Sequence, residues 1–306
     1  MRKVLALIVA TLVLSFSGCS SKEAGAAEAT PSKPAEIEVS TYLVGSYVDS
    51  ETAQAKLTEA GFEVITAYEV DKKGQFTAVL FTNSALKASA NKTDRGFAAV
   101  LRLLVNNEKQ EISITNPVYF DKAFLQDDSD YQAALVVEKS LRDAFGTLTN
   151  SADKWEYDGL ASYHFMMGMP YFEENAVLSE GDNEALLEKA RNYKKGKNLI
   201  FELQIGEGRT LLGYALGKKT SKFVKKIGYQ NAQVLPYTVL IEEGKAKILA
   251  PKYYIAISYP QLTMGEFMTI ASVPGAIEKD LKTIQISHSF GAICTGVHLS
   301  THISAL

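Results

Sequence analysis

Two histidines and a cysteine near the C-terminal end have a spacing that suits metal binding. His298 and His302 are four residues apart, so on a helix they would share one face, as two zinc ligands often do. Cys294 precedes His298 by four residues. The segment has no capping residues and little hydrophobic periodicity, and composition alone supports a metal site only weakly. We therefore expect no bound cofactor, with metal binding through this tail as an alternative function.

A second set of residues could line a ligand-binding cleft, because concave sites favour aromatic walls with a few polar groups. The candidates follow the predicted strands of the second half: Arg209, Tyr214, Tyr237, Thr238, Tyr253 and Tyr254. Side chains alternate along a strand, so Tyr237 and Thr238 would face opposite ways and the whole set cannot converge. The alternative is that these tyrosines pack in the core or across strands.

A lysine-rich segment offers a third candidate, an anion-binding patch made by Lys218, Lys219 and Lys222. It would be larger if it met the lysines of residues 194–197, and it could then bind an anionic ligand or lipid headgroups. The alternative is that these lysines only solvate a face. A formal net charge of −3 gives no reason to expect nucleic acid as a partner, since that needs a concentrated basic face.

The N-terminus predicts a secreted, lipid-anchored protein. Arg2 and Lys3 precede an apolar run over residues 4–14, which is too short to span a bilayer. The following Phe16-Ser17-Gly18-Cys19 resembles a bacterial lipobox, which implies cleavage after residue 18 and acylation of Cys19. Ser20 after the cysteine then implies the periplasmic face of the outer membrane. Residues 19–38 are rich in Ala, Ser, Lys, Glu and Pro and predict a flexible tether.

Motifs of the common catalytic classes are missing from the sequence. It has no Gly-x-Ser-x-Gly elbow, no His-Glu-x-x-His and no Cys-x-x-Cys. Acylation of Cys19 would leave one other cysteine, Cys294, so no intramolecular disulfide is expected. We expect a non-enzymatic ligand-binding or adaptor module on the membrane, with a homo-oligomer or an envelope protein as partner. An enzyme or redox protein on the same scaffold is the alternative.

An internal repeat organises the elements that would carry these residues. The segment Val234–Tyr254 predicts a β-hairpin around Glu242-Glu243-Gly244-Lys245, and Val100–Phe120 repeats it without a gap, since 251 − 117 = 134. The chain therefore predicts an α+β fold of two tandem β-α-β-β-α-β-β-α repeats, with sheets covered by helices. The boundaries are residues 39–146 for the first repeat, 147–162 for a linker, 163–285 for the second repeat and 286–306 for the tail.

Local signals place individual elements. Asp49 or Ser50 predicts a helix start, and Asp182 predicts another. Thr263 and Glu266 have the spacing of a capping box. Phe165-Met166-Met167-Gly168 echoes Tyr42-Leu43-Val44-Gly45, and we expect both to be strands.

The region from Asn198 to Leu281 resembles the widespread family catalogued as domain of unknown function 302. The resemblance rests on Leu212-Gly213-Tyr214, Leu235-Pro236-Tyr237-Thr238-Val239 and Met264-Gly265-Glu266-Phe267-Met268. The family's hairpin typically opens with Leu-Pro-Cys-Asn-Val, and here Tyr237 and Thr238 stand where the Cys and Asn would be. The resemblance implies an α+β fold and a tendency to self-associate, with no established activity. A function that used the thiol would be lost, because a phenol does not replace a thiolate.

Overall fold

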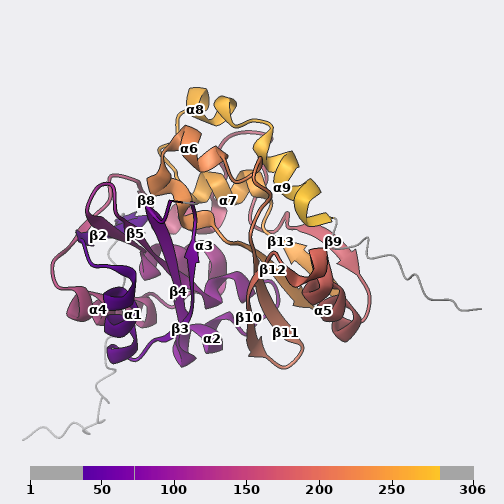
Figure 1. Ribbon diagram of the computed structural model, residues 1–306, viewed down its shortest axis with the longest axis horizontal. Coiled ribbons are helices and arrows are strands. Elements are labelled where there is room, and N and C mark those ends of the chain that lie inside the picture. The colour runs from indigo at the N-terminus through magenta and orange to yellow at the C-terminus, as the bar shows by residue number, and fades with distance from the viewer. Residues whose placement is uncertain (1–36, 72, 283–306) are drawn as a thin grey trace, which may run out of the picture. The chain divides into compact units, whose positions relative to one another are not determined.

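The computed structural model describes residues 37–71 and 73–282, which belong to one unit, Ala35–Leu306 (Figure 1). The predicted signal peptide, Cys19, most of the predicted tether and the tail with Cys294, His298 and His302 lie outside the described residues.

The first half contains a six-stranded antiparallel sheet in the order β3-β4-β5-β6-β2-β7. Its strand at residues 76–82 buries apolar side chains on both faces, which is typical of a sheet covered on both sides. The bounds are β2 (Tyr42–Ser46), β3 (Glu63–Glu69), β4 (Phe76–Thr82), β5 (Leu101–Asn106), β6 (Glu111–Thr115) and β7 (Leu148–Asn150).

The second half contains a five-stranded antiparallel sheet in the order β10-β11-β12-β13-β9. Its strands are β9 (Ala176–Glu180), β10 (Leu199–Gly206), β11 (Arg209–Tyr214), β12 (Tyr237–Glu242) and β13 (Lys245–Ile248). A separate pair joins β1 (Glu38–Ser40) to β8 (Lys154–Glu156). The stretch predicted as a linker thus carries β7 and β8, which pair with strands of the first half.

Helices cover both sheets, so the predicted α+β class is confirmed. The α-helices are α1 (Ser50–Glu59), α2 (Ser84–Ala90), α3 (Pro117–Leu125), α4 (Tyr131–Phe145), α5 (Asn183–Asn192), α6 (Phe223–Ile227), α7 (Pro251–Ser258), α8 (Met264–Thr269) and α9 (Val273–Lys282). Asp49 caps α1 and Asp182 caps α5, as predicted, and the capping box of Thr263 and Glu266 is formed at α8.

Three details of the predicted repeat are wrong. The hairpin segments do not stay extended to their ends, because Pro117 and Pro251 begin α3 and α7. Proline has no N–H for a strand ladder and suits the first position of a helix. The two hairpin loops also differ, since residues 107–110 connect β5 to β6 whereas only 243–244 connect β12 to β13. Residues 165–168 are not a strand; β9, further along the chain, pairs with β13 instead.

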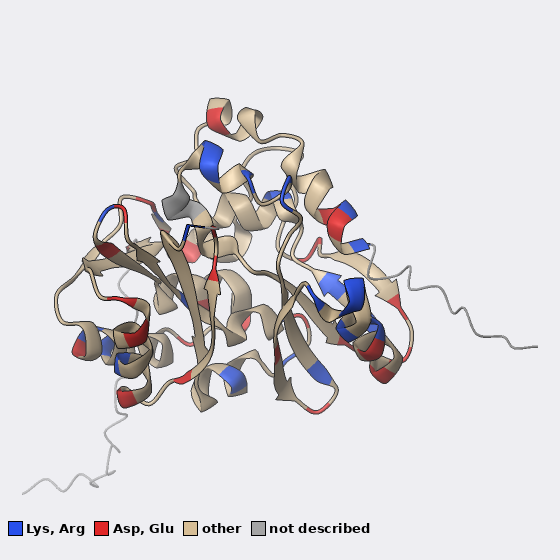
Figure 2. Cartoon of the chain, in the orientation of Figure 1, with Lys and Arg blue, Asp and Glu red and all other residues tan. Residues whose placement is uncertain are grey.

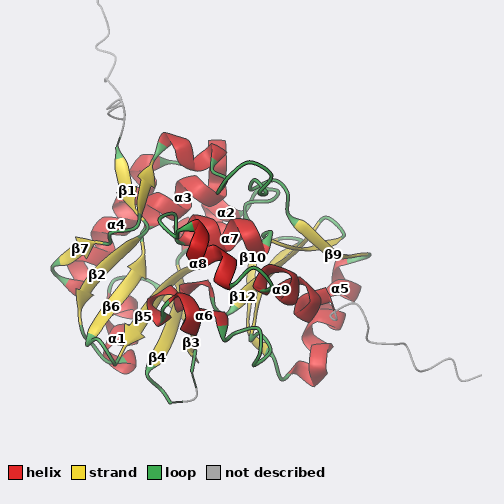
Figure 3. Cartoon of the chain, turned by 90° about the horizontal axis from the view of Figure 1, so that it is seen from above, coloured by secondary structure: helices red, strands yellow, loops and turns green. Residues whose placement is uncertain are grey.

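The first sheet has a separate apolar layer on each face. On one face, Leu57 of α1 and Leu141 of α4 pack with Leu43, Leu103 and Ile114 of the sheet. The other face belongs to a larger cluster that contains residues of both halves. In the view from above, α3 and α7 lie between the strands of the first sheet and those of the second (Figure 3). The two halves therefore share one core.

Helix α7 is buried except at Lys252, and tyrosine hydroxyls cap its last carbonyls. The final four carbonyl groups of a helix have no partner within it and need donors from elsewhere. Tyr163 donates to the carbonyl of Ala256 at 3.0 Å, and Tyr119 to that of Ile257 at 2.7 Å. Tyr42 donates to the carbonyl of Ser258 at 3.0 Å. Because these phenols come from β2, α3 and the segment after β8, they fix α7 against three parts of the chain.

The contact between α3 and α7 is reciprocal. Tyr119 of α3 donates to the carbonyl of Ile257, and Tyr253 of α7 donates to the carbonyl of Ala123 at 3.2 Å. The two donors, Tyr119 and Tyr253, are 134 residues apart, since 253 − 119 = 134. The two acceptors, Ala123 and Ile257, are separated by the same number, since 257 − 123 = 134. Burial raises the pKa of both phenols well above its usual value, so each hydroxyl keeps the proton that it donates.

We predict that Tyr119→Phe lowers the free energy of unfolding by about 1–3 kcal/mol, because a buried carbonyl loses its donor. Tyr253→Phe should cost less, since the carbonyl of Ala123 also accepts from Nε2 of Gln126. Urea unfolding followed by circular dichroism measures both. Tyr47→Phe is the control, because the half-buried Tyr47 hydroxyl makes no hydrogen bond to the described residues. An equal cost for Tyr119→Phe and Tyr253→Phe would contradict this account.

Candidate functional site

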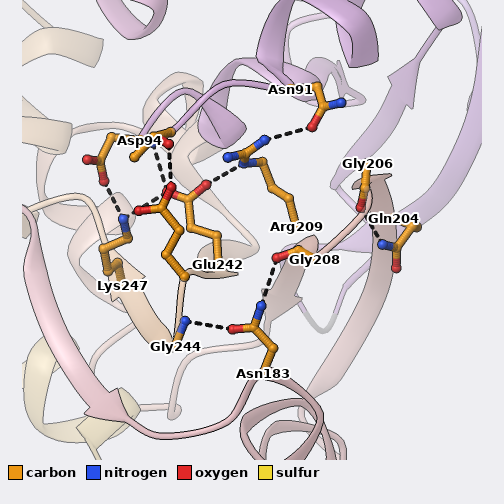
Figure 4. A network of polar contacts seen from close by, with 12 residues as sticks. Asn91, Asp94, Asn183, Gln204, Gly206, Gly208, Arg209, Glu242, Gly244 and Lys247 are labelled. Carbon is orange, nitrogen blue, oxygen red and sulfur yellow. Dashed lines mark hydrogen bonds and ion pairs between the residues drawn. The ribbon is translucent and has the colours of Figure 1, made fainter.

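An ion network joins the loop after α2 to the three inner strands of the second sheet, β11, β12 and β13 (Figure 4). Glu242, whose side chain is 1% exposed, accepts from Nζ of Lys247 at 2.8 Å and from the backbone N–H of Asp94 at 2.8 Å. Its other oxygen accepts from Nε of Arg209. Nη1 of Arg209 donates to Asn91 at 2.7 Å, and Lys247 also pairs with the Asp94 carboxylate. The network therefore crosses between residues 91–94 of the first half and β11, β12 and β13.

The charges of this network balance within it. Two carboxylates, Glu242 and Asp94, face two cations, Arg209 and Lys247. Burial lowers the pKa of Lys247, but its hydrogen bonds to Asp94 and Glu242 outweigh this, and the pKa of Lys247 is raised. A neutral, internally satisfied cluster has little to offer a charged ligand. Arg209, which was predicted to line a cleft, instead connects the two halves through its bonds to Asn91 and Glu242.

The predicted cleft tyrosines lie in the core. Tyr214, Tyr237 and Tyr253 are at most 2% exposed, and each hydroxyl is held by a backbone carbonyl. Tyr237, for example, donates to the carbonyl of Leu249 at 2.8 Å and packs edge-on against Tyr254. Thr238 is also buried, beside Gly213 of β11. These residues have the packing role that was weighed against the cleft.

The two lysine-rich segments do come together. Asn198 and Ala215 exchange a pair of hydrogen bonds, both 2.8 Å long, which places residues 194–197 near Lys218 and Lys219. Lys218, Lys219 and Lys222 are exposed. Asp280 lies at the same junction, where its carboxylate accepts from the N–H of Gly217 at 2.9 Å. Basic and acidic residues are interspersed across the fold, so this patch sits beside opposite charge (Figure 2).

Several hollows mark the surface without forming an enclosed site. One of about 360 Å³ lies between α1 and α4 and is lined mainly by charged and polar side chains such as Lys56, Glu59 and Asp143. Two small hollows of about 10 and 20 Å³ flank Asp121 between α2, α3 and α4, and each has room for about one water molecule. Burial raises the pKa of Asp121 to about 7, although the N–H of Asp130 donates to its carboxyl group.

Metal ligands of the usual kinds do not gather in the described part of the chain. Residues 37–71 and 73–282 contain no group of three or more His, Cys, Asp and Glu side chains that could hold a metal ion. The predicted ligands Cys294, His298 and His302 lie outside these residues.

An exposed group of methionines was missed by the sequence analysis. The methionine surface comprises Met166, Met167, Met169, Met264 and Met268, which are all the methionines except Met1. Met167 is 93% exposed, Met268 62%, Met166 45% and Met264 41%. The rings of Phe165 and Phe267 stack at 5.1 Å, so the loop before β9 and helix α8 lie side by side. The crowding of methionines into two short segments was the signal that could have revealed this surface.

Large apolar side chains that gather at a surface generally mark an interaction site. Methionine in particular gives an adaptable, polarisable contact. The ion network and the buried tyrosines have their polar groups held internally, and the exposed lysines lie beside the Asp280 carboxylate, so we take the methionine surface as the main candidate site in the described part of the chain. Comparison with protein-family models, with curated proteins and with solved structures found no match for this chain.

We predict that Glu242→Gln lowers the free energy of unfolding by about 3–5 kcal/mol, because it leaves Arg209 without its buried counter-charge. The control is Glu243→Gln, since the neighbouring Glu243 is exposed and Gln keeps the acceptor for Thr93. Chemical denaturation should show a change within about 0.5 kcal/mol for this control. Similar losses in the two variants would contradict a specific role for the buried charge of Glu242.

We predict that Asp121→Asn stabilises the protein more at pH 8 than at pH 5. The pKa of Asp121 is raised on folding, so its contribution to stability is full below about pH 4 and is lost as the pH rises through about 7. At pH 8 the native carboxylate is charged in a desolvated place, and Asn removes that charge but keeps an acceptor for Asp130. Urea unfolding at the two pH values measures the difference. A variant effect that is independent of pH would contradict the raised pKa.

Proposed function

We propose that this chain is a lipoprotein of the bacterial cell envelope whose folded part is a non-enzymatic ligand-binding or adaptor module. The observation that carries the proposal is the exposed methionine surface, formed by the loop around Met167 and by helix α8. Apolar contact area of this kind favours association with another molecule.

The proposed membrane anchor is inferred from the sequence alone, from Cys19 and the tether at residues 19–38. Acylation of Cys19 would hold the protein at the periplasmic face of the outer membrane, because several acyl chains anchor a protein stably where one does not. Within the described residues, no helix has the length and hydropathy needed to cross a membrane.

A non-enzymatic role is supported by how the polar groups are used. The buried tyrosines donate to backbone carbonyls, and the carboxylates of the ion network are paired with cations. A redox role on the related family's scaffold would need the thiol that Tyr237 replaces, and that phenol is fully buried. The proposal includes membership of the second half in the family of domain of unknown function 302, which the sequence resembles.

We also propose that the two halves arose by duplication of one β-α-β-β-α-β-β-α unit. If β2 to β6 correspond to β9 to β13 in chain order, the two sheets have the same strand order, apart from the extra β7. Helix α3 begins at Pro117 and α7 begins at Pro251, 134 residues later. Tyr119 and Tyr253 of these helices make the reciprocal contact. Such reciprocity is the pattern of a two-fold symmetric interface, in which residue i contacts j and j contacts i.

We predict that native mass spectrometry of the full-length protein, gently extracted from its own membranes, shows the mass of an acylated chain. It should also show an added ligand or partner that is lost on unfolding. The matched variant carries Met167→Glu and Met268→Glu, which place charge on the proposed binding surface, and it should lose the added mass but keep the acyl mass. Cys19→Ser should remove the acyl mass and release the chain from the membrane.

The experiment tests the lipid anchor and the binding role separately. A chain without acyl groups would overturn the lipoprotein assignment. A bare acylated chain, or an added mass that the Met167→Glu, Met268→Glu variant retains unchanged, would overturn the binding role of the methionine surface.

A further inference from the structure

The side chains of the methionine surface are donors of one chemical kind. Each offers an uncharged thioether sulfur, and soft sulfur ligands of this type select Cu(I) and similar monovalent ions over hard cations. Carboxylates, which would favour Mg²⁺ or Ca²⁺, do not gather into a metal-binding group in the described part of the chain. The thioether donors of this surface therefore favour soft monovalent ions over Mg²⁺ and Ca²⁺.

Two of the exposed methionines lie in one tight turn. The carbonyl of Met166 accepts from the N–H of Met169 at 2.9 Å, closing a tight turn over Met167 and Gly168. Gly168 takes a φ of +81°, which glycine adopts without strain in such a turn. Met169 packs partly against the core, whereas Met166 and Met167 remain exposed. The turn is thus anchored by one methionine and presents the other two.

Helix α8 supplies two more sulfurs beside the loop. Met264 and Met268 are four residues apart, so they lie on one face of the helix with their Cβ atoms about 5–6 Å apart. Phe267, which lies between them in sequence, is buried and stacks on Phe165, the residue before Met166. The aromatic pair therefore joins the two methionine pairs (α8 is at the top of Figure 1).

An imidazole lies at the border of this group. His164 precedes Phe165 and its ring lies 4.4 Å from that of Tyr171. Within the described residues, no hydrogen bond engages the ring nitrogens of His164, which leaves them open to a ligand. Imidazole binds copper as well as zinc, so His164 is compatible with the same metal.

We propose that the methionine surface binds a monovalent soft metal ion, Cu(I) in the cell, through the thioethers of Met166, Met167, Met264 and Met268. This inference rests on the proposed binding role of the same surface and names its ligand class. It differs from the tail hypothesis, because it uses neither Cys294 nor the histidines at positions 298 and 302.

The test uses Ag(I), which has the same charge and softness as Cu(I) and needs no reductant. The full-length chain carries Cys19→Ser and Cys294→Ser, so that no thiol competes, and its methionine methyl groups are labelled with ¹³C. Silver nitrate is titrated in chloride-free buffer with detergent, and the methyl signals are followed by NMR. We expect the signals of Met166, Met167, Met264 and Met268 to shift together and to saturate at one Ag(I) per chain. Met1 serves as the internal reference and should not shift.

The matched variant is Met264→Leu with Met268→Leu, which removes two sulfurs but keeps an apolar helix face of nearly the same volume. Its affinity for Ag(I) should fall at least about tenfold. Val136→Ala, at an exposed apolar residue on α4, should leave the affinity unchanged. Unchanged affinity in the leucine variant, or shifts of Met1 equal to those of the four surface methionines, would overturn the inference.

The outcome also separates this inference from the proposed function. If Ag(I) does not bind while native mass spectrometry still finds a methionine-dependent partner, the metal inference is wrong and the binding role stands. If neither is found, both are wrong.

Discussion

A buried helix must satisfy its last carbonyl groups without water, and this constraint shapes the centre of the molecule. In α7 the carbonyls of Ala256, Ile257 and Ser258 accept from three phenols of the surrounding chain. A phenol suits this role because its ring fills apolar space while its hydroxyl reaches a polar atom. An unsatisfied carbonyl at this depth would cost about as much as a lost hydrogen bond, so the tyrosines and the helix depend on each other.

The same contacts explain why the halves share one core. One face of the first sheet is covered by its own helices, α1 and α4, but the other face enters a cluster that includes α7. That cluster contains α3 of the first half as well as residues of the second half. The ion network around Glu242 adds polar contacts between the two halves, because Glu242 also accepts from the N–H of Asp94. Buried ion pairs stabilise little by themselves, yet breaking one leaves an uncompensated charge, so this tie favours a single arrangement of the halves.

The interior and the surface of the protein use their residues differently. In the interior, the hydroxyls of the buried tyrosines are bonded to backbone carbonyls, and the carboxylates of the ion network are paired with cations. The methionines lie at the periphery, on a turn and a short helix held in place by the stack of Phe165 on Phe267. Binding residues are commonly found on such connecting segments, which a rigid scaffold positions. The methionine side chains are thus exposed, while the segments that carry them are held together by the stack of Phe165 on Phe267.

The sequence by itself determined where several helices begin, because a cap depends on neighbouring residues. Asp49, Asp182 and the Thr263–Glu266 box all begin helices as predicted. It also predicts a repeat at an offset of 134 residues, although the differing hairpin loops and the helices that begin at Pro117 and Pro251 did not follow from that prediction. Only the tertiary structure decided what Tyr237 or Glu242 does, since a side chain's role depends on which distant group meets it. The methionine surface is of the same kind, because two segments about 100 residues apart form it only when Phe165 meets Phe267.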